Sequence, residues 1–169
     1  MALAGFATDR TTKMLAERYL EIQTPKPLLG SYLQLTLWYN EGAAFGVRLG
    51  GPWVHTILSL MAMVLIAYLI WQTPRREAFN LTSYGLIMGG ALGNLWDRLF
   101  TGRVTDFIEM GIGRYHWPTF NVADACVVIG IVLLIIAHSY SSRSARSHDD
   151  EQVSSAAGSQ GATAGPGSG

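Results

Sequence analysis

Three long apolar stretches alternate with polar blocks along the chain, and each approaches the roughly 20 residues that a helix needs to cross a bilayer. They run over 54–71, 81–100 and 124–140. The first of them is almost uninterrupted, whereas the second contains glycines and ends in polar residues. The pattern therefore predicts membrane-spanning helices at about 54–72, 81–99 and 124–140.

The first segment, MALAGFATDRTTKMLAERYL, resembles the end of a fourth span over about 1–20. Because few residues precede Asp9, a full crossing would need roughly ten more apolar residues. We expect either that the start codon was assigned too late or that the segment was lost. With this segment, the chain is predicted to be a mainly α membrane protein built as a four-helix transmembrane bundle.

Two blocks, 25–52 and 101–120, are too polar to span lipid and are expected at the interface. SYLQLTLWY over 31–39 alternates in part, which favours a strand, and VTDFI over 104–108 is also strand-like. A small β-sheet outside the membrane is therefore expected. The tail over 141–169 is rich in Ser, Ala and Gly and is expected to be disordered.

The charged loops predict an orientation in the membrane. With four spans, the loop of Arg75 and Arg76 lies on the same side as the tail of Arg143 and Arg146, and the positive-inside rule makes that side cytoplasmic. Both polar blocks would then lie on the outer face.

Composition agrees with a membrane location, since 49% of the 169 residues are apolar and 14% are charged. The formal net charge is zero, so no basic field indicates a nucleic-acid partner. The histidines show no metal-ligand spacing, and the single Cys126 allows no internal disulfide.

Polar residues collect at the end of the 81–99 helix. Asn94, Asp97 and Arg98 are three and four positions apart, so they share a helix face and indicate a buried network or a site. Gly89 and Gly93 share another face, and we interpret them as a surface for close helix packing.

Two acids lie in unusual surroundings. Asp106 shares a strand face with Val104 and Ile108, and Asp124 begins the last helix, where it is expected to serve as the N-cap. If the two carboxyl groups are close, both cannot ionise easily, and they can share a proton. Such a pair can activate water against an amide carbonyl without a metal or another cofactor.

Two other interpretations stay open. Intramembrane acids often mark ion paths, so the chain could be a proton-coupled transporter, although the acids gather at one face and no repeat is visible. It could also be a non-catalytic scaffold in which the acids serve as caps and network members.

Five stretches, in order, resemble bacterial lipoprotein signal peptidases (signal peptidase II), which are membrane aspartyl peptidases. These are DRTTK at 9–13, NEGAAFG at 40–46, GGALGNLWDR at 89–98, VTDFI at 104–108 and FNVAD at 120–124. The resemblance extends over roughly three quarters of the chain. It implies a peptidase domain over 1–140 with both termini cytoplasmic, a small extracytoplasmic sheet and an interfacial arm.

The resemblance also implies a function. Members cleave the signal peptides of prolipoproteins before a cysteine that carries diacylglyceryl, in the bacterial inner membrane and near its outer face, with membrane lipids as neighbours. The family's catalytic pair falls on Asp106 and Asp124. The implied roles of the other site residues are substrate binding or positioning for one group and support for another. The first group is Asn40, Gly42, Asn94, Arg98 and Asn121, and the second is Asp9, Lys13 and Asp97.

Overall fold

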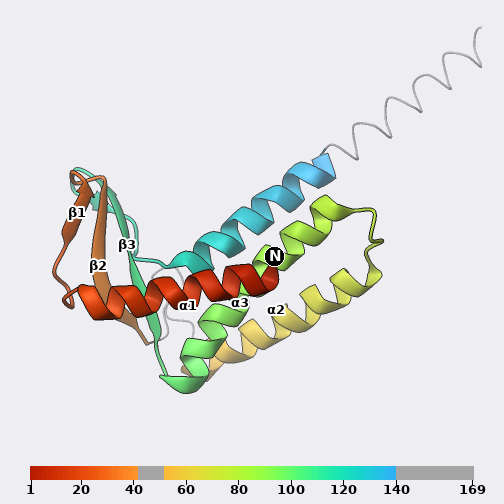
Figure 1. The fold of residues 1–169 in the computed structure, drawn as a ribbon, viewed down its shortest axis with the longest axis horizontal. Coiled ribbons are helices and arrows are strands. Elements are labelled where there is room, and N and C mark those ends of the chain that lie inside the picture. The colour runs from red at the N-terminus through yellow and green to blue at the C-terminus, as the bar shows by residue number, and fades with distance from the viewer. Residues whose placement is uncertain (42–51, 140–169) are drawn as a thin grey trace, which may run out of the picture. The chain divides into compact units, whose positions relative to one another are not determined.

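The fold is that of a computed structural model of the chain, and the description covers residues 1–41 and 52–139 (Figure 1). Gly42, the expected interfacial arm and the tail over 141–169 lie outside the described residues. The chain divides into two units, Met1–Leu133 and Leu134–Gly169. All contacts discussed below belong to the first unit.

The described residues are mainly helical. The helices are α1 (Ala2–Tyr19), α2 (Pro52–Gln72), α3 (Ala78–Phe100) and a last helix, Val122–Ser139. Of these, α2 and the last helix are long and apolar enough to cross a membrane. Many of their large apolar side chains are exposed, among them Leu65 and Trp71 of α2 and Ile129 of the last helix. Membrane crossing by α1 and α3 stays a prediction.

Glycines on α3 let other helices approach it closely. A Cβ on Gly89 would lie 2.6 Å from the carbonyl oxygen of Ala2, and one on Gly90 would lie 2.2 Å from that of Ala123. Neither position has room for a side chain, so α1 and the last helix both pack on α3 through backbone contact. The packing role predicted for Gly89 is confirmed, and Figure 1 shows α1 crossing α3.

Four strands form one antiparallel sheet in the order β1-β2-β3-β4. They are β1 (Lys26–Leu29), β2 (Leu33–Asn40), β3 (Val104–Ile112) and β4 (Tyr115–His116). The two strands predicted from the alternating pattern therefore pair with each other as β2 and β3. Trp38 pairs with Asp106, and an irregularity in β2 between Leu35 and Trp38 shifts the register. β3 also continues past the predicted VTDFI segment.

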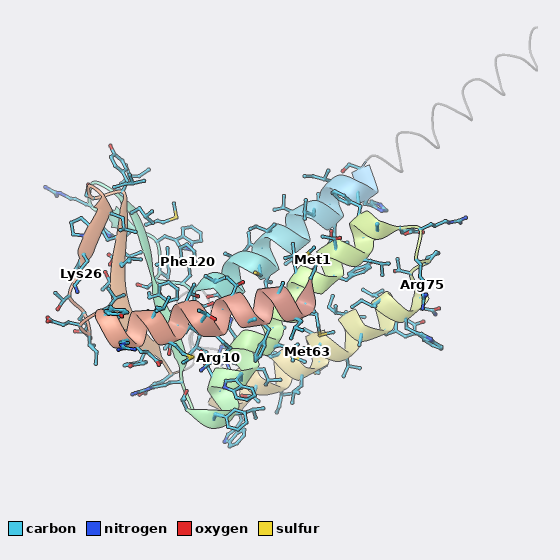
Figure 2. The ribbon with its side chains drawn as sticks, viewed as in Figure 1. Met1, Arg10, Lys26, Met63, Arg75 and Phe120 are labelled. Carbon is cyan, nitrogen blue, oxygen red and sulfur yellow. The ribbon has the colours of Figure 1, made fainter. Side chains whose placement is uncertain are left out.

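Backbone hydrogen bonds join the start of the last helix to β3. The N–H groups of Phe107 and Ile108 both donate to the carbonyl of Phe120, at 3.0 and 2.8 Å, and the Phe120 N–H donates back to Ile108 at 3.0 Å. Phe120 is labelled in Figure 2. Because the helix begins two residues later, this bridge places its first turn beside Asp106.

The largest fully buried side chains are mostly charged or amide-bearing, which is unusual for a protein core. Lys13, Asn121, Asp9 and Asp97 are each at most 1% exposed. Since buried polar groups require hydrogen bonds or ion pairs, these residues are expected to satisfy one another.

Candidate active site

Asn121 and Asp124 cap the last helix reciprocally. The Asp124 N–H donates to Oδ1 of Asn121 at 3.0 Å, and the Asn121 N–H donates to Oδ2 of Asp124 at 3.3 Å. This exchange has the form of a capping box, in which two N–H groups that lack helical partners are satisfied together. The cap is therefore Asn121, and Asp124 occupies the third helical position rather than the predicted N-cap.

A third N–H of this helix start is satisfied from another element. The Ala123 N–H donates to Oδ1 of Asp9 on α1 at 2.9 Å. Two carboxylates, from Asp9 and Asp124, thus lie at the N-terminal end of the helix, where the helix dipole favours negative charge. The site is built around this end.

Asp106 accepts two amide donors from different directions. Asn121 Nδ2 lies 2.6 Å from Oδ1, and Asn40 Nδ2, at the end of β2, lies 3.2 Å from Oδ2. The side chain is 2% exposed. Burial and then the nearby negative charge of Asp124 raise the pKa of Asp106 to about 7, against the lowering effect of both amides and of Lys13. A carboxyl group with this pKa can hold a proton near neutral pH.

Asn94 of α3 connects the acid pair to a buried ion cluster. Its Nδ2 donates to Oδ1 of Asp124 at 2.7 Å, and its Oδ1 accepts from Asn121 Nδ2 at 3.1 Å. The same Oδ1 accepts from Lys13 Nζ at 3.0 Å. The orientation of the Asn94 amide is thereby defined on both sides.

Lys13 lies at the centre of the ion cluster. Its Nζ pairs with Oδ2 of Asp9 at 2.9 Å, one helical turn away, and with Oδ2 of Asp97 on α3 at 2.8 Å. Asp97 also accepts from the N–H of Thr105 at 3.3 Å and pairs with Arg10, which is labelled in Figure 2. The cluster therefore joins α1, α3 and the residue just before Asp106.

Arg10 was not predicted as part of the site from the sequence, although it stands beside Asp9 in DRTTK and pairs with Asp97 in the structure.

The close approach of the Asp9 carboxylate to α3 explains why position 93 is a glycine, since a Cβ on Gly93 would lie 2.3 Å from Oδ2 of Asp9. Gly93 therefore leaves space for the carboxylate as well as for a helix. This second role has no signal in the spacing of the glycines.

Arg98 donates a side-chain hydrogen bond to a residue outside the group predicted for it. Although it shares a helix face with Asn94 and Asp97 by spacing, its Nη1 donates to Oγ of Ser59 on α2 at 3.3 Å. Arg98 lines a cavity of about 300 Å³ with Asn40, Glu41 and Thr56, which are polar, and with Trp53, Leu99 and Gly102. Ser59 had no sequence signal because its partner is contributed by a different helix.

Glu109 on β3 is partly buried. It accepts from Thr36 Oγ1 at 2.5 Å, and His116 Nδ1 lies 2.7 Å from its other oxygen. These three residues form a polar cluster that ties β4 to β3.

Known proteins similar to this chain are lipoprotein-processing enzymes. The chain matches the family described as signal peptidase (SPase) II over residues 1–140. A protein of Francisella tularensis subsp. novicida named lipoprotein signal peptidase is 45% identical over 143 residues, which cover 81% of this chain and 88% of that protein. One of Halalkalibacterium halodurans with the same name is 38% identical over 136 residues, covering 80% and 87%.

Two solved structures share the fold. Both are described as bacterial membrane enzymes studied by the in meso method. One has a TM-score of 0.76 at 30% identity and covers 83% of this chain and 86% of the other. The second has a TM-score of 0.72 at 32% identity and covers 80% and 88%.

Proposed function

The chain belongs to the signal peptidase II family and removes the signal peptides of prolipoproteins, and from this premise we propose that it is an aspartic endopeptidase whose reacting groups are Asp106 and Asp124. The observation that carries the proposal is the hydrogen-bonded link between the two acids. Asn121 donates to both carboxyl groups, one through its side chain and one through its backbone.

Asp106 holds the shared proton at the start of the reaction, because burial and the charge of Asp124 raise the pKa of Asp106 to about 7. Asp124 is then the base that accepts a proton from the attacking water. The hydroxide adds to the scissile carbonyl carbon, and Asp106 donates its proton to the carbonyl oxygen, as in an aspartic protease. Collapse of the tetrahedral gem-diol breaks the C–N bond: one hydroxyl proton returns to Asp106 as the new carboxyl group forms, and the proton held by Asp124 passes to the leaving amine.

The polar cavity beside Asn40 and Arg98 suits a peptide backbone. A peptide entering an apolar environment must satisfy its N–H and C=O groups, and this cavity offers an arginine, an amide, a carboxylate and a hydroxyl. We assign Asn40 and Arg98 to this part of the site, and Gly42 keeps the substrate-positioning role that the family resemblance implies. Asn94 and Asn121 line the substrate's scissile bond and orient the two acids through their hydrogen bonds.

Asp9, Lys13 and Asp97 support the site. They do not line the polar cavity. Lys13 instead donates to the amide oxygen of Asn94, and Asp97 accepts from the N–H of Thr105, the residue before Asp106. Their contribution is to keep the donors of both acids in position.

The substrate is a prolipoprotein cut before a cysteine that already carries diacylglyceryl, in the inner membrane and near its outer face. Two apolar helices in the described residues support a membrane location. The two acids lie at the N-terminal end of the last helix, Asp124 on the helix itself and Asp106 on the adjacent β3. A lipid-anchored substrate would present its first peptide bonds there. Family membership favours this function over transport or a scaffold.

The test is cleavage of a purified lipidated prolipoprotein by Asp106→Asn and Asp124→Asn. Each change should lower kcat by about 10²–10⁴-fold, because each removes a proton donor or acceptor. Glu21→Gln, which changes an exposed carboxylate, is the matched control and should leave kcat unchanged.

Folding must be followed separately, because Asp124 is also part of the helix cap. A thermal melt of Asp124→Asn should show only a small loss, since an asparagine can still accept from the Asn121 N–H. Near-normal turnover by either variant would overturn the aspartic mechanism.

A further inference from the structure

Three side chains at successive turns of α1 reach the three elements that carry the site. Asp9, Lys13 and Glu17 are spaced four positions apart, so they share one face of the helix. Asp9 accepts from the start of the last helix, and Lys13 donates to α3. Glu17 reaches β3, because its Oε1 accepts from the hydroxyl of Thr105 at 2.7 Å. Glu17 was not predicted as part of the site from the sequence.

Thr105 directly precedes Asp106 and is held by acids from two different helices. Its N–H donates to Oδ2 of Asp97 on α3 at 3.3 Å, and its hydroxyl donates to Glu17 on α1. Thr105 is 3% exposed, so its hydroxyl has little access to water if the carboxylate of Glu17 is removed. A hydroxyl that donates to a carboxylate at 2.7 Å also makes a short, charge-assisted hydrogen bond. The bond therefore fixes Thr105 against α1.

The position of Thr105 controls that of Asp106. Consecutive residues of a strand point to opposite faces, so the two side chains leave β3 in opposite directions. The Thr105 side chain reaches α1, whereas the Asp106 carboxylate meets the amides of Asn121 and Asn40. Since Asn121 also contacts Asp124, a displacement of β3 at Thr105 would disturb the link between the two acids.

We propose that Glu17 is a positioning residue for Asp106 and that it acts through the hydroxyl of Thr105. This inference rests on the proposed function, because it concerns the placement of one of the two reacting acids. Neither Glu17 nor Thr105 is among the described residues that line the polar cavity. Loss of their hydrogen bond should therefore slow the chemical step and leave substrate binding unchanged.

The experiment measures kcat and KM separately for cleavage of a purified lipidated prolipoprotein. Thr105→Val and Glu17→Ala should each lower kcat by about tenfold at unchanged KM, since a small displacement of a reacting group is costly in rate. Thr105→Ser keeps a hydroxyl donor and Glu17→Gln keeps an acceptor oxygen, so both should keep kcat within about twofold.

The two disruptive substitutions should not add, because either one removes the same hydrogen bond. The double variant Glu17→Ala/Thr105→Val should be about tenfold slower than the unchanged protein, as each single variant is. Independent effects would instead multiply to about a hundredfold.

Thr36→Val is the matched control. Thr36 is 5% exposed, lies on the neighbouring β2 and donates its hydroxyl to a glutamate, Glu109, at 2.5 Å. It repeats the bond of Thr105 on the same sheet, but the residue that follows it is Leu37 rather than a reacting acid. Thr36→Val should therefore leave kcat and KM unchanged.

Thermal melts separate positioning from folding. Thr105→Val leaves no buried group without a partner, because Glu17 is exposed and regains water. Its melting temperature should stay close to that of the unchanged protein. Thr105→Ser, which loses a buried methyl group, should melt lower and yet keep its kcat.

Four outcomes would overturn the proposal. Full kcat in Thr105→Val or Glu17→Ala would mean that the bond does not position Asp106. A rise in KM at unchanged kcat would indicate contact with the substrate. A loss in Glu17→Gln as large as in Glu17→Ala would make the charge of Glu17 the cause. An equal loss in Thr36→Val would indicate a general effect of the sheet.

Failure of this inference is distinct from failure of the aspartic mechanism. If Glu17 does not position Asp106, Glu17→Ala cuts normally while Asp106→Asn and Asp124→Asn remain inactive. If the aspartic mechanism is wrong, those two variants cut, whatever the kcat of Glu17→Ala shows.

Discussion

The side-chain amide of Asn121 lies 2.6 Å from the Asp106 carboxylate, although the two residues belong to different elements. The same side chain accepts from the Asp124 N–H at 3.0 Å and so caps the last helix. Cap and donor are thus two functions of one residue. Because the oxygen performs the first and the nitrogen performs the second, substitutions can separate them.

Asn121→Ser should keep the cap and lose the donor, whereas Asn121→Ala should lose both. Both variants should therefore lose most of their activity, but only the alanine variant should lose about 1 kcal/mol of stability through the cap. Activity on a lipidated substrate and thermal melts check the two effects. Equal stability of the two variants would contradict the capping role.

The activity should fall as pH rises through about 7. Asp106 must hold a proton to act as the acid, and its pKa is raised to about 7 by burial and by the charge of Asp124. Above that value Asp106 loses its proton and can no longer act as the acid, so kcat/KM should decrease about tenfold per pH unit. A flat profile between pH 7 and 9 would contradict the assignment of the proton to Asp106.

The same pKa predicts how stability depends on pH. The pKa of Asp106 is raised from 3.8 to about 7 on folding, so between these values the folded protein binds more protons than the unfolded chain. The contribution of this group to stability is complete below about 4 and is lost as pH rises through about 7. Asp106→Asn should consequently melt higher than the unchanged protein at pH 8, while the two should agree near pH 4.

Lys13→Met should destabilise the protein by about 3–5 kcal/mol, because it leaves the carboxylates of Asp9 and Asp97 buried without their shared cation. Lys26→Met, at an exposed lysine, is the control and should change stability little. Adding Asp97→Asn to Lys13→Met should recover part of the loss. A double variant no more stable than the single one would argue against charge as the cause.

Gly93→Ala should lower both stability and activity, since its Cβ would lie 2.3 Å from the Asp9 carboxylate, which caps the last helix. Gly5→Ala is the matched control, because its Cβ would meet its nearest neighbour at 3.6 Å. That variant should be neutral or slightly more stable, as alanine favours helix over glycine. Thermal melts and cleavage rates of both variants test the comparison.

Sequence patterns predicted the elements better than the contacts between them. The long apolar stretches indicated the helices, and the strand-like segments indicated β2 and β3, because these features are local. The hydrogen bond from Lys13 to Asn94 could not be predicted from spacing, since the two residues are 81 positions apart. Spacing also placed Asp97 and Arg98 in one group, yet Asp97 pairs with Lys13 of α1, and Arg98 donates to Ser59 of α2.

The N-cap was also misplaced for a physical reason. An acid and an asparagine three positions apart both suit a helix start, and choosing the cap requires the position of the backbone. The bridge of Phe120 to β3 supplies that information, because it ends at the residue before Asn121. The last helix therefore begins two residues before the predicted 124.

The buried cluster around Lys13 has a consequence for how the protein is assembled. Taken alone, α1 would bury Asp9 and Lys13 with only each other, and α3 would bury Asp97 without Lys13 and Arg10, the two α1 cations that pair with it in the fold. The ion cluster is complete only when the two helices pack together. The transfer of its charged groups out of water therefore becomes favourable only then. We therefore expect the burial of α1 to be complete only once α3 has been synthesised.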